Sequence, residues 1–444
     1  MAARLGVAVR RDPPVRARYP FASLGAALVL IFLSPFVSLT LNYLAFGICV
    51  YRVIRYDESV FAVDYCVLSG VSYIFLTTGR VSLFAWLSIV AAIWYLVRDG
   101  LAVNASLILL IAVFDYMLVR MGTAINDLVL CFSQLLMLYV LLSRQRRESI
   151  VPCALAFCGS VLVSSGYALV FRNVYQLRSL LGSEVAAYWG SSLTRFQGLF
   201  RDPNYYMTML TVAIVLLVVL WVNRYVSARA LVAGACPLVL FGALTYSKTF
   251  LIVLALLVVL FLGMLVHEGR YGLALGGALL AVVAVVVLSQ TVFSVTLLRI
   301  SSADSLYDLT TGRSELLVEY LREIAESAEV LLFGKGLSAE ILGRGTHNLF
   351  LEFAYFLGLT GLLLMVAYAV SLLRLAGRRF RREGENPNGV FRYVALVAFV
   401  LLFCTLQGMT FSITYTMLYL AILVTDIWPR EGGAKRSDAK RGER

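Results

Sequence analysis

Charged residues are scarce in this sequence, and their scarcity limits the class of protein. Only 14% of the 444 residues are charged, whereas 61% are hydrophobic and the mean hydropathy is +0.86. Soluble domains carry about 25% charged residues. The composition therefore excludes a soluble globular protein, and the apolar runs leave no room for a separate soluble domain.

Cysteine and histidine form no cluster that could hold a metal or build a disulfide framework. All seven cysteines fall inside apolar runs, so we interpret them as small core residues. The chain has two histidines, His267 and His347, far apart in the sequence. We expect no metal site, no structural disulfide and no cofactor.

Apolar runs long enough to cross a bilayer recur from Phe21 to Trp428. A spanning helix needs roughly 20 mostly apolar residues. We predict an all-α, polytopic transmembrane bundle of about fourteen spans, forming one domain over residues 21–428 between tails 1–20 and 429–444. The predicted spans are 21–36, 38–54, 61–78, 81–97, 103–120, 127–142, 150–170, 204–222, 230–246, 249–266, 272–290, 348–373, 393–408 and 410–428.

Positive charge predicts the orientation, because Lys and Arg accumulate on the cytoplasmic side. They crowd into both tails and into loops 143–149 and 374–392. Both termini are therefore predicted to be cytoplasmic, with the two long loops, 171–203 and 291–347, outside. The net charge of +12 follows from this topology. Nucleic-acid binding is not expected, since the basic loops lack interleaved aromatic residues.

The second outer loop is too long for a simple connection, and long loops often carry function. Residues 312–330 place apolar side chains at helical spacing opposite charged ones, which predicts an amphipathic helix on the membrane surface. The loop holds more acids than cations, which favours specific anion contacts over a general basic coat. Its cations are Arg299, Arg313, Arg322, Lys335 and Arg344.

The end of the first outer loop suits an anion. Arg195 and Arg201 lie on either side of Gly198, and Pro203 begins the next span beside Asn204. A helix N-terminus with free N–H groups can bind a phosphate or carboxylate. The alternative is a loop packed against lipid headgroups, with its arginines on the lipid phosphates.

Lys248 occupies a very short outer turn and so lies near the hydrocarbon boundary. A cation within the membrane costs about 2.5–3.5 kcal/mol on insertion scales and usually faces a pathway or a partner. The alternative is a lysine that extends to the outer interface. Gly334-Lys335-Gly336 lacks the other glycines of a nucleotide-binding loop, so a kinase or ATPase is excluded.

His347 stands at the entry of a span, followed by Asn348 and preceded by Arg344. Imidazole is the side chain best matched to proton transfer near neutral pH, and the apolar bundle would exclude water. The alternative is a hydrogen-bonded interface residue at a helix N-terminus.

Several of these motifs occur in the order found in the superfamily of O-antigen ligases and O-antigen polymerases, which build bacterial envelope glycans. The chain resembles this family over roughly residues 190–365. The matching pieces are Arg195-x-x-Gly198, Pro203-Asn204, Ser247-Lys248-Thr249, Gly312-Arg313, Gly334-x-Gly336, and His347-Asn348-Leu349-Phe350-Leu351 with Gly358 and Gly361.

The resemblance implies a GT-C-like membrane glycosyltransferase in the bacterial inner membrane. Its donor would be an undecaprenyl-diphosphate-linked glycan and its acceptor a glycolipid, with transfer at the outer face, inversion at the anomeric carbon and no metal. Membrane lipids and a chain-length regulator would be its other partners. Members commonly have arginine where Lys248 stands. We assign catalysis to His347, Arg313 and Arg195, and substrate binding to Lys248, Arg201, Arg344, Gly198, Asn204 and Asn348.

Three functions remain open. The span count favours a polymerase, which joins lipid-linked repeat units, over a ligase, which moves the polymer to a lipid A-core or similar acceptor. A lipid-linked glycan transporter is the alternative outside enzymes. Transporters show internal repeats and polar groups at the bilayer midplane. The sequence shows no repeat. Asp64 and Asp115 are the only acids well inside the early spans, and either could be a packing partner.

Overall fold

The computed structural model describes most of the chain, and the described part is helical apart from one β-hairpin. The predicted all-α class is thus confirmed at the level of class. The N-terminal tail up to residue 18, the C-terminal tail and Arg344 lie outside the described residues. The structure describes residues 19–122, 124–182, 185–188, 191–267, 269–291, 293–302, 305, 312–339, 346–380, 389–404 and 412–427.

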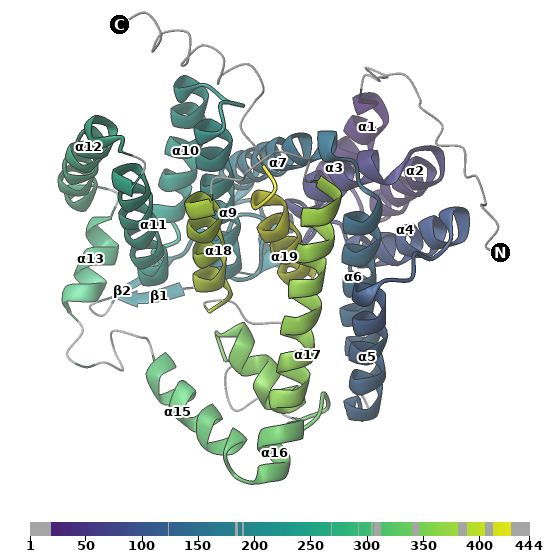
Figure 1. Cartoon of the computed structure of the whole chain (residues 1–444). Coiled ribbons are helices and arrows are strands. Elements are labelled where there is room, and N and C mark those ends of the chain that lie inside the picture. Colours follow the sequence, from purple (N-terminus) through teal and green to yellow (C-terminus); the bar gives the residue numbers. More distant parts are fainter. Residues whose placement is uncertain are drawn as a thin grey trace, which may run out of the picture.

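A helix occupies each of the fourteen stretches that the hydropathy pattern indicated (Figure 1). These helices are α1 (Phe21–Leu33), α2 (Leu41–Arg55), α3 (Glu58–Ser69), α4 (Leu83–Asp99), α5 (Ala105–Arg120), α6 (Ile125–Arg144), α7 (Ile150–Phe171), α9 (Pro203–Val222), α10 (Ala228–Ala243), α11 (Lys248–His267), α12 (Tyr271–Gln290), α17 (Leu349–Phe380), α18 (Gly389–Phe403) and α19 (Ser412–Val424).

Among the described residues, five helices are long and apolar enough to cross a membrane: α6, α7, α9, α11 and α17. The α7 stretch there includes a preceding 3₁₀ turn, Arg147–Ser149. Other helices, including α1, α10 and α12, are apolar, but their apolar stretches among the described residues are too short to meet the same length requirement. Large apolar side chains on α11 and α12 are exposed, as lipid-facing surfaces require. The helices therefore suit a membrane protein.

α9 is the most buried of these five helices and lies at the centre of the bundle. It packs against α7, α10, α11, α18 and α19. Its buried hydroxyls, Thr208 and Thr211, donate to carbonyls of the preceding turn, so the buried helix leaves neither hydroxyl unsatisfied. The helix thus holds its first turn, which belongs to the candidate site, in a fixed position.

α3 ends at Ser69, short of the predicted limit at residue 78. The chain then continues through turns up to α4. Asn42, fully buried on α2, donates to the carbonyls of Ile74 and Leu76 at 2.9 and 2.8 Å. A buried amide that satisfies non-helical carbonyls allows the helix to end early inside the bundle. The hydropathy pattern did not reveal this.

Both long loops contain secondary structure. The first carries α8 (Tyr175–Leu181) and the hairpin of β1 (Val185–Tyr188) and β2 (Ser191–Thr194). The second carries α13 (Ser294–Ser301), α15 (Arg313–Ile324) and α16 (Ala328–Phe333). α15 and α16 confirm the predicted amphipathic helix but divide it in two, because Ser327 accepts from the N–H of Val330 and caps a new start.

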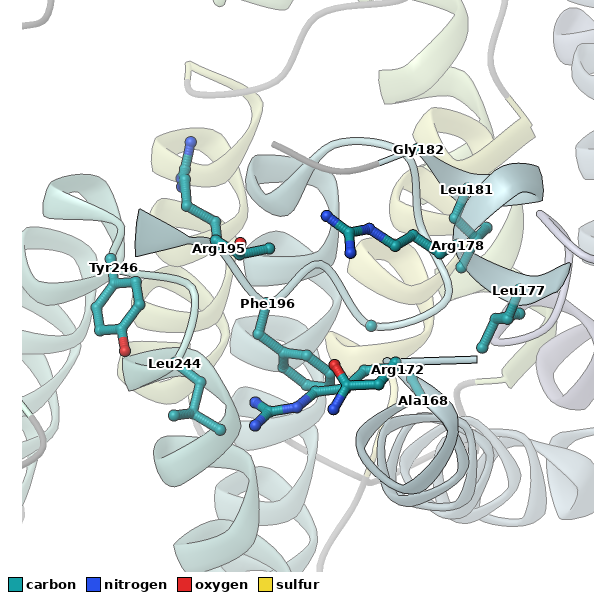
Figure 2. Close-up of a pocket in the computed structure, with 13 residues that line it drawn as sticks. Ala168, Arg172, Leu177, Arg178, Leu181, Gly182, Arg195, Phe196, Leu244 and Tyr246 are labelled. Atoms are coloured by element: carbon teal, nitrogen blue, oxygen red, sulfur yellow. The ribbon is translucent and has the colours of Figure 1, made fainter. Parts of the chain in front are cut away.

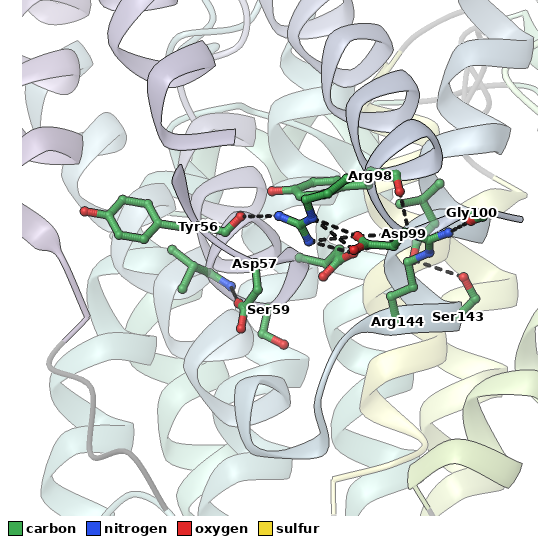
Figure 3. A network of polar contacts seen from close by, with 12 residues as sticks. Tyr56, Asp57, Ser59, Arg98, Asp99, Gly100, Ser143 and Arg144 are labelled. Carbon is green, nitrogen blue, oxygen red and sulfur yellow. Dashed lines mark hydrogen bonds and ion pairs between the residues drawn. The ribbon is translucent and has the colours of Figure 1, made fainter. Parts of the chain in front are cut away.

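A polar network lies at the end of the bundle where α7 begins (Figure 3). Arg98 contacts Asp99 at 2.8 Å and Glu58 at 3.2 Å, and Arg144 contacts the same two carboxylates at 3.2 and 3.5 Å. Arg379 donates to the carbonyl of residue 145 at 2.8 Å. These contacts join α3, α4, α6 and the end of α17.

The contacts of Asp64 confirm that this residue is a packing partner. Its carboxylate accepts two hydrogen bonds from Arg52, each 2.7 Å, and both side chains are almost fully buried. Arg52 also donates to Ser23 and to the carbonyl of Pro20. This buried pair joins α1, α2 and α3 through charge-assisted hydrogen bonds.

Five of the seven cysteines are buried, as expected for core residues, but Cys236 and Cys404 are exposed. Cys236 lies on an outward face of α10 and Cys404 just beyond α18. An apolar run does not distinguish a core-facing position from a lipid-facing one, because both are apolar in a membrane helix.

Candidate functional site

The turn between α10 and α11, residues 244–247, is short and its backbone is constrained. Tyr246 has a positive φ of 49°, unusual for a residue other than glycine. Ser247 caps α11 by accepting from the N–H of Phe250 at 3.3 Å. Lys248 and Thr249 are the first residues of the helix, half-buried. The predicted position of Lys248, between two helices with little loop, is confirmed.

Three arginines from distant parts of the chain contact this turn and the start of α11. Arg195 donates from Nε to the carbonyl of Thr245 at 2.9 Å. Arg299, on α13, donates to the carbonyl of Tyr246. Arg313, the first residue of α15, donates to Oγ1 of Thr249 at 3.3 Å. Together with Lys248, these residues form a cluster of four cations, named here the cation cluster.

Burial lowers the pKa of two members of the cation cluster, Arg299 and Arg313. At Arg313, the negative charge of Asp202 partly offsets this effect on the pKa. A half-buried guanidinium has lost part of its hydration, so an anionic partner at this place would stabilise it strongly. The cluster is thus suited to an anionic ligand.

Arg299 was missed as a candidate from the sequence. It appeared there as one cation among the five of the second outer loop, without a motif around it. The signal that could have indicated it is the excess of acids over cations in that loop, which made each cation a candidate for a specific contact. Its partner, the carbonyl of Tyr246, lies more than 50 residues away in sequence.

The first turn of α9 lies close to the cation cluster, since the charge of Asp202 acts on Arg313. Asp202 caps α9 by accepting from the N–H of Asn204 at 2.6 Å, and Pro203 occupies the first helical position, as predicted. The sequence pattern indicated free N–H groups here, but the cap uses one of them. Arg201 is exposed.

Gly198 is buried and packed against α9. Its φ is +58°, and a Cβ at this position would lie 2.4 Å from the ring of Tyr206. Phe196 packs edge-on against the same ring, with 5.4 Å between the two ring centroids. Glycine is therefore required here by backbone conformation and by space, which fixes the segment between Arg195 and α9.

The start of α17 holds the other predicted catalytic residue. Asn348 caps the helix, because its Oδ1 accepts from the N–H groups of Phe350 and Leu351 at 3.0 and 3.2 Å. His347 is half-buried and has a positive φ of 48°. Strained backbone of this kind often occurs at functional sites.

Glu352, one turn into α17, is a buried acid that the sequence analysis did not select. Glu352 lies within electrostatic range of Tyr205 in the first turn of α9 and of Tyr415 on α19. An acid near the start of a strongly apolar run was the sequence feature that could have indicated Glu352 as a candidate site residue.

The Gly334-Lys335-Gly336 turn holds the second outer loop against α17. α17 is broken at Gly358, whose φ is 65°. The N–H of Lys335 donates to the carbonyl of Tyr355 at 2.8 Å, and that of Gly336 donates to the carbonyl of Phe356 at 2.9 Å. A break in a helix removes the usual partners of these carbonyls, so the turn replaces them.

This turn has a positioning role. The side chain of Lys335 forms ion pairs with Glu323, at 3.0 Å, and with Glu326. These contacts raise the pKa of Lys335. The turn thus ties α15, which carries Arg313, to the segment of α17 that follows His347.

The predicted site residues within the described part of the chain lie on three elements. Arg195, Lys248 and Arg313 are brought together at the α10–α11 turn. Gly198, Arg201 and Asn204 belong to the segment that enters α9, and His347 and Asn348 to the start of α17. No protein-family model, curated protein or solved structure matches this chain, so the family resemblance rests on its own motifs.

Proposed function

We propose that the chain is a membrane glycosyltransferase that polymerises undecaprenyl-diphosphate-linked oligosaccharide repeat units. In this proposal it crosses the bacterial inner membrane about fourteen times with a GT-C-like fold, both termini are cytoplasmic, and the reaction occurs at the extracytoplasmic face. The observation that carries the proposal is the cation cluster. Arg195, Arg299 and Arg313 come from separate segments and meet at the α10–α11 turn and the start of α11.

The arrangement of the two ends of the bundle supports the proposed sidedness. α7 has 22 residues and is therefore about 33 Å long. Loops 143–149 and 374–392, both proposed to be cytoplasmic, meet where α7 begins, through the contact of Arg379. The segment entering α9 contacts the α10–α11 turn at the opposite end (Figure 1).

The chemistry follows from the charge of a diphosphate. The acceptor hydroxyl oxygen attacks the anomeric carbon of the donor sugar, and the bond from that carbon to the diphosphate oxygen breaks. Undecaprenyl diphosphate leaves with the bonding electron pair. Negative charge develops on the leaving group, so guanidinium groups beside it stabilise the transition state more than the ground state. No metal is needed in this scheme.

His347 would accept the proton of the acceptor hydroxyl. The imidazole has the pKa range suited to this transfer near neutral pH. Glu352 lies one turn further along α17 and is buried, so its carboxylate can stabilise an imidazolium electrostatically. Attack from the face opposite the diphosphate inverts the anomeric centre.

Loss of His347 and Arg313 tests the proposal. His347→Ala and Arg313→Ala should each abolish glycan extension in a strain that lacks the native gene, while membrane insertion stays normal. Arg322→Ala is the matched control, because Arg322 lies on the same helix as Arg313 and is exposed. Normal surface glycan from both site variants would reject the glycosyltransferase assignment.

The product that accumulates distinguishes the polymerase from its alternatives. A missing polymerase leaves single repeats on the capped core. A missing ligase leaves lipid-linked polymer that never reaches a lipid A-core or other acceptor, and a missing transporter leaves lipid-linked repeats in the cytoplasmic leaflet. The break in α17 resembles the broken helices of transporters. However, Gly334 packs against Gly358, and the freed carbonyls accept from the N–H groups of Lys335 and Gly336 and from the Tyr116 hydroxyl.

A further inference from the structure

A pocket of about 330 Å³ lies beside the cation cluster (Figure 2). One wall is the end of α7 with α8, including Arg172 and Arg178. The second is the segment that contains Arg195, and the third is the end of α10 with Tyr246. The volume is within the range of small-ligand sites, about 300–1,000 Å³.

Hydrogen bonds between these walls form the pocket within the chain itself. Nε2 of Gln197 donates to the carbonyls of Leu181 and Gly182 at 3.2 and 3.0 Å, which ties the middle segment to α8. The N–H of Phe196 donates to the carbonyl of Leu244 at 3.0 Å, which ties the segment that contains Arg195 to the end of α10. The pocket is therefore built by main-chain and buried amide contacts.

The charge of the pocket is positive. Arg172, Arg178 and Arg195 line it, and no acid is among its described lining residues. Within the described part of the chain, no carboxylate forms an ion pair with Arg172 or Arg178. Figure 2 shows these two arginines extending from the α7–α8 side, opposite Tyr246. By contrast, Arg98 and Arg144, at the opposite end of the bundle, form ion pairs with Glu58 and Asp99.

We propose that this pocket binds an oxyanion carried by a sugar of the glycan, a carboxylate or a phosphate substituent, next to the diphosphate. Guanidinium groups bind such oxyanions through paired charge-assisted hydrogen bonds. The pocket shares Arg195 with the cation cluster, and it is also lined by Tyr246, whose carbonyl accepts from Arg299. A glycan joined to a diphosphate at the cluster therefore enters the pocket directly. The identity of the ligand as a glycan rests on the proposed function.

The test measures binding by the full chain in phosphatidylcholine nanodiscs, without any transfer reaction. Trigalacturonic acid is the charged probe and maltotriose the neutral one. The charged probe should bind about tenfold more tightly than maltotriose, the difference expected when charge-assisted hydrogen bonds are added. R172Q/R178Q should remove this difference. Arg55→Gln is the control, because Arg55 is also exposed but lies at the end of α2, near the other end of α7.

Three outcomes overturn the proposal. The first is equal affinity for both probes, and the second is unchanged binding in R172Q/R178Q. The third is displacement of trigalacturonic acid by equimolar dihexanoyl phosphatidylglycerol, which would identify a lipid headgroup as the occupant. Transfer assays on His347→Ala and Arg313→Ala give a separate result, so failure of the pocket and failure of the proposed function are distinguishable.

Discussion

The backbones of Gly334 and Gly358 pass so close that a Cβ on either residue would lie 2.5 Å from the backbone nitrogen of the other. Both residues have positive φ angles, 74° and 65°. Tyr116 on α5 donates to the carbonyl of Leu357 at 2.7 Å, where the break leaves that carbonyl without its helical partner. The contact joins the second outer loop, α5 and α17 at one point.

Gly358→Ala should destabilise the protein by about 3 kcal/mol or more, because neither its backbone conformation nor the space beside Gly334 accepts a methyl group. A lower melting temperature in detergent, followed by tryptophan fluorescence, checks this. Gly377→Ala is the control within α17, where a Cβ meets no atom within 4 Å and alanine favours the helix. Equal melting temperatures for the two variants would contradict the proposed close contact.

Asn348 has two candidate roles, and its substitutions separate them. As the cap of α17, it should tolerate Asn348→Ser, whose hydroxyl can accept the same N–H groups, while Asn348→Ala should cost about 1 kcal/mol. As a substrate contact, it should lose activity in both variants. We expect stability and transfer activity to fall together in Asn348→Ala and to be largely kept in Asn348→Ser.

Arg299 is expected to contribute to diphosphate binding, although no motif contains it. Arg299→Gln should lower kcat/KM by roughly tenfold to a hundredfold, the effect of losing one charged hydrogen bond of about 1.5–3 kcal/mol. The measurement is transfer in membranes with graded amounts of donor. Arg322→Gln, an exposed arginine of the same loop, should keep full activity. A normal rate in Arg299→Gln would remove this residue from the site.

The Arg52–Asp64 pair should be essential as a pair. Asp64→Ala leaves a buried guanidinium without its carboxylate and should cost about 3–5 kcal/mol. The double variant Arg52→Met/Asp64→Leu removes both charges and should be closer to the native protein in melting temperature. If the double variant were no more stable than Asp64→Ala, an uncompensated charge would not be the cause.

The polar network at the start of α7 predicts a pH dependence. Hydrogen bonding from Arg98 lowers the pKa of Asp99 below its ordinary value, while burial raises the pKa of Glu58. A carboxyl whose pKa is lower in the folded state stabilises the protein above its unfolded pKa, about 3.9, and this contribution is lost as the pH falls through the folded pKa.

Asp99→Asn should therefore lower the melting temperature at pH 6, and the difference from the native protein should shrink towards pH 3. Asp115→Asn, at an exposed acid on α5 outside the network, serves as the control. A difference that stays constant between pH 6 and pH 3 would show that Asp99 does not stabilise the protein through its charge.

The amino-acid sequence was sufficient to predict the all-α class and the approximate position of the apolar helices. Runs of apolar residues must form helices in an apolar medium, since every backbone group has to be paired within the segment. Local signals were equally reliable where one residue sets the backbone, as at Pro203, which begins α9, and in the amphipathic stretch that forms α15.

Which residues come into contact could be seen only in the folded chain. The sequence could not place Arg299 on the carbonyl of Tyr246, or Asn42 on carbonyls more than 30 residues away, because these partners are main-chain groups without a sequence signal. It could not show that Gly334 fits against Gly358, since close packing depends on both backbones at once. The same holds for the pocket beside the cation cluster, whose walls come from three segments that only folding brings together.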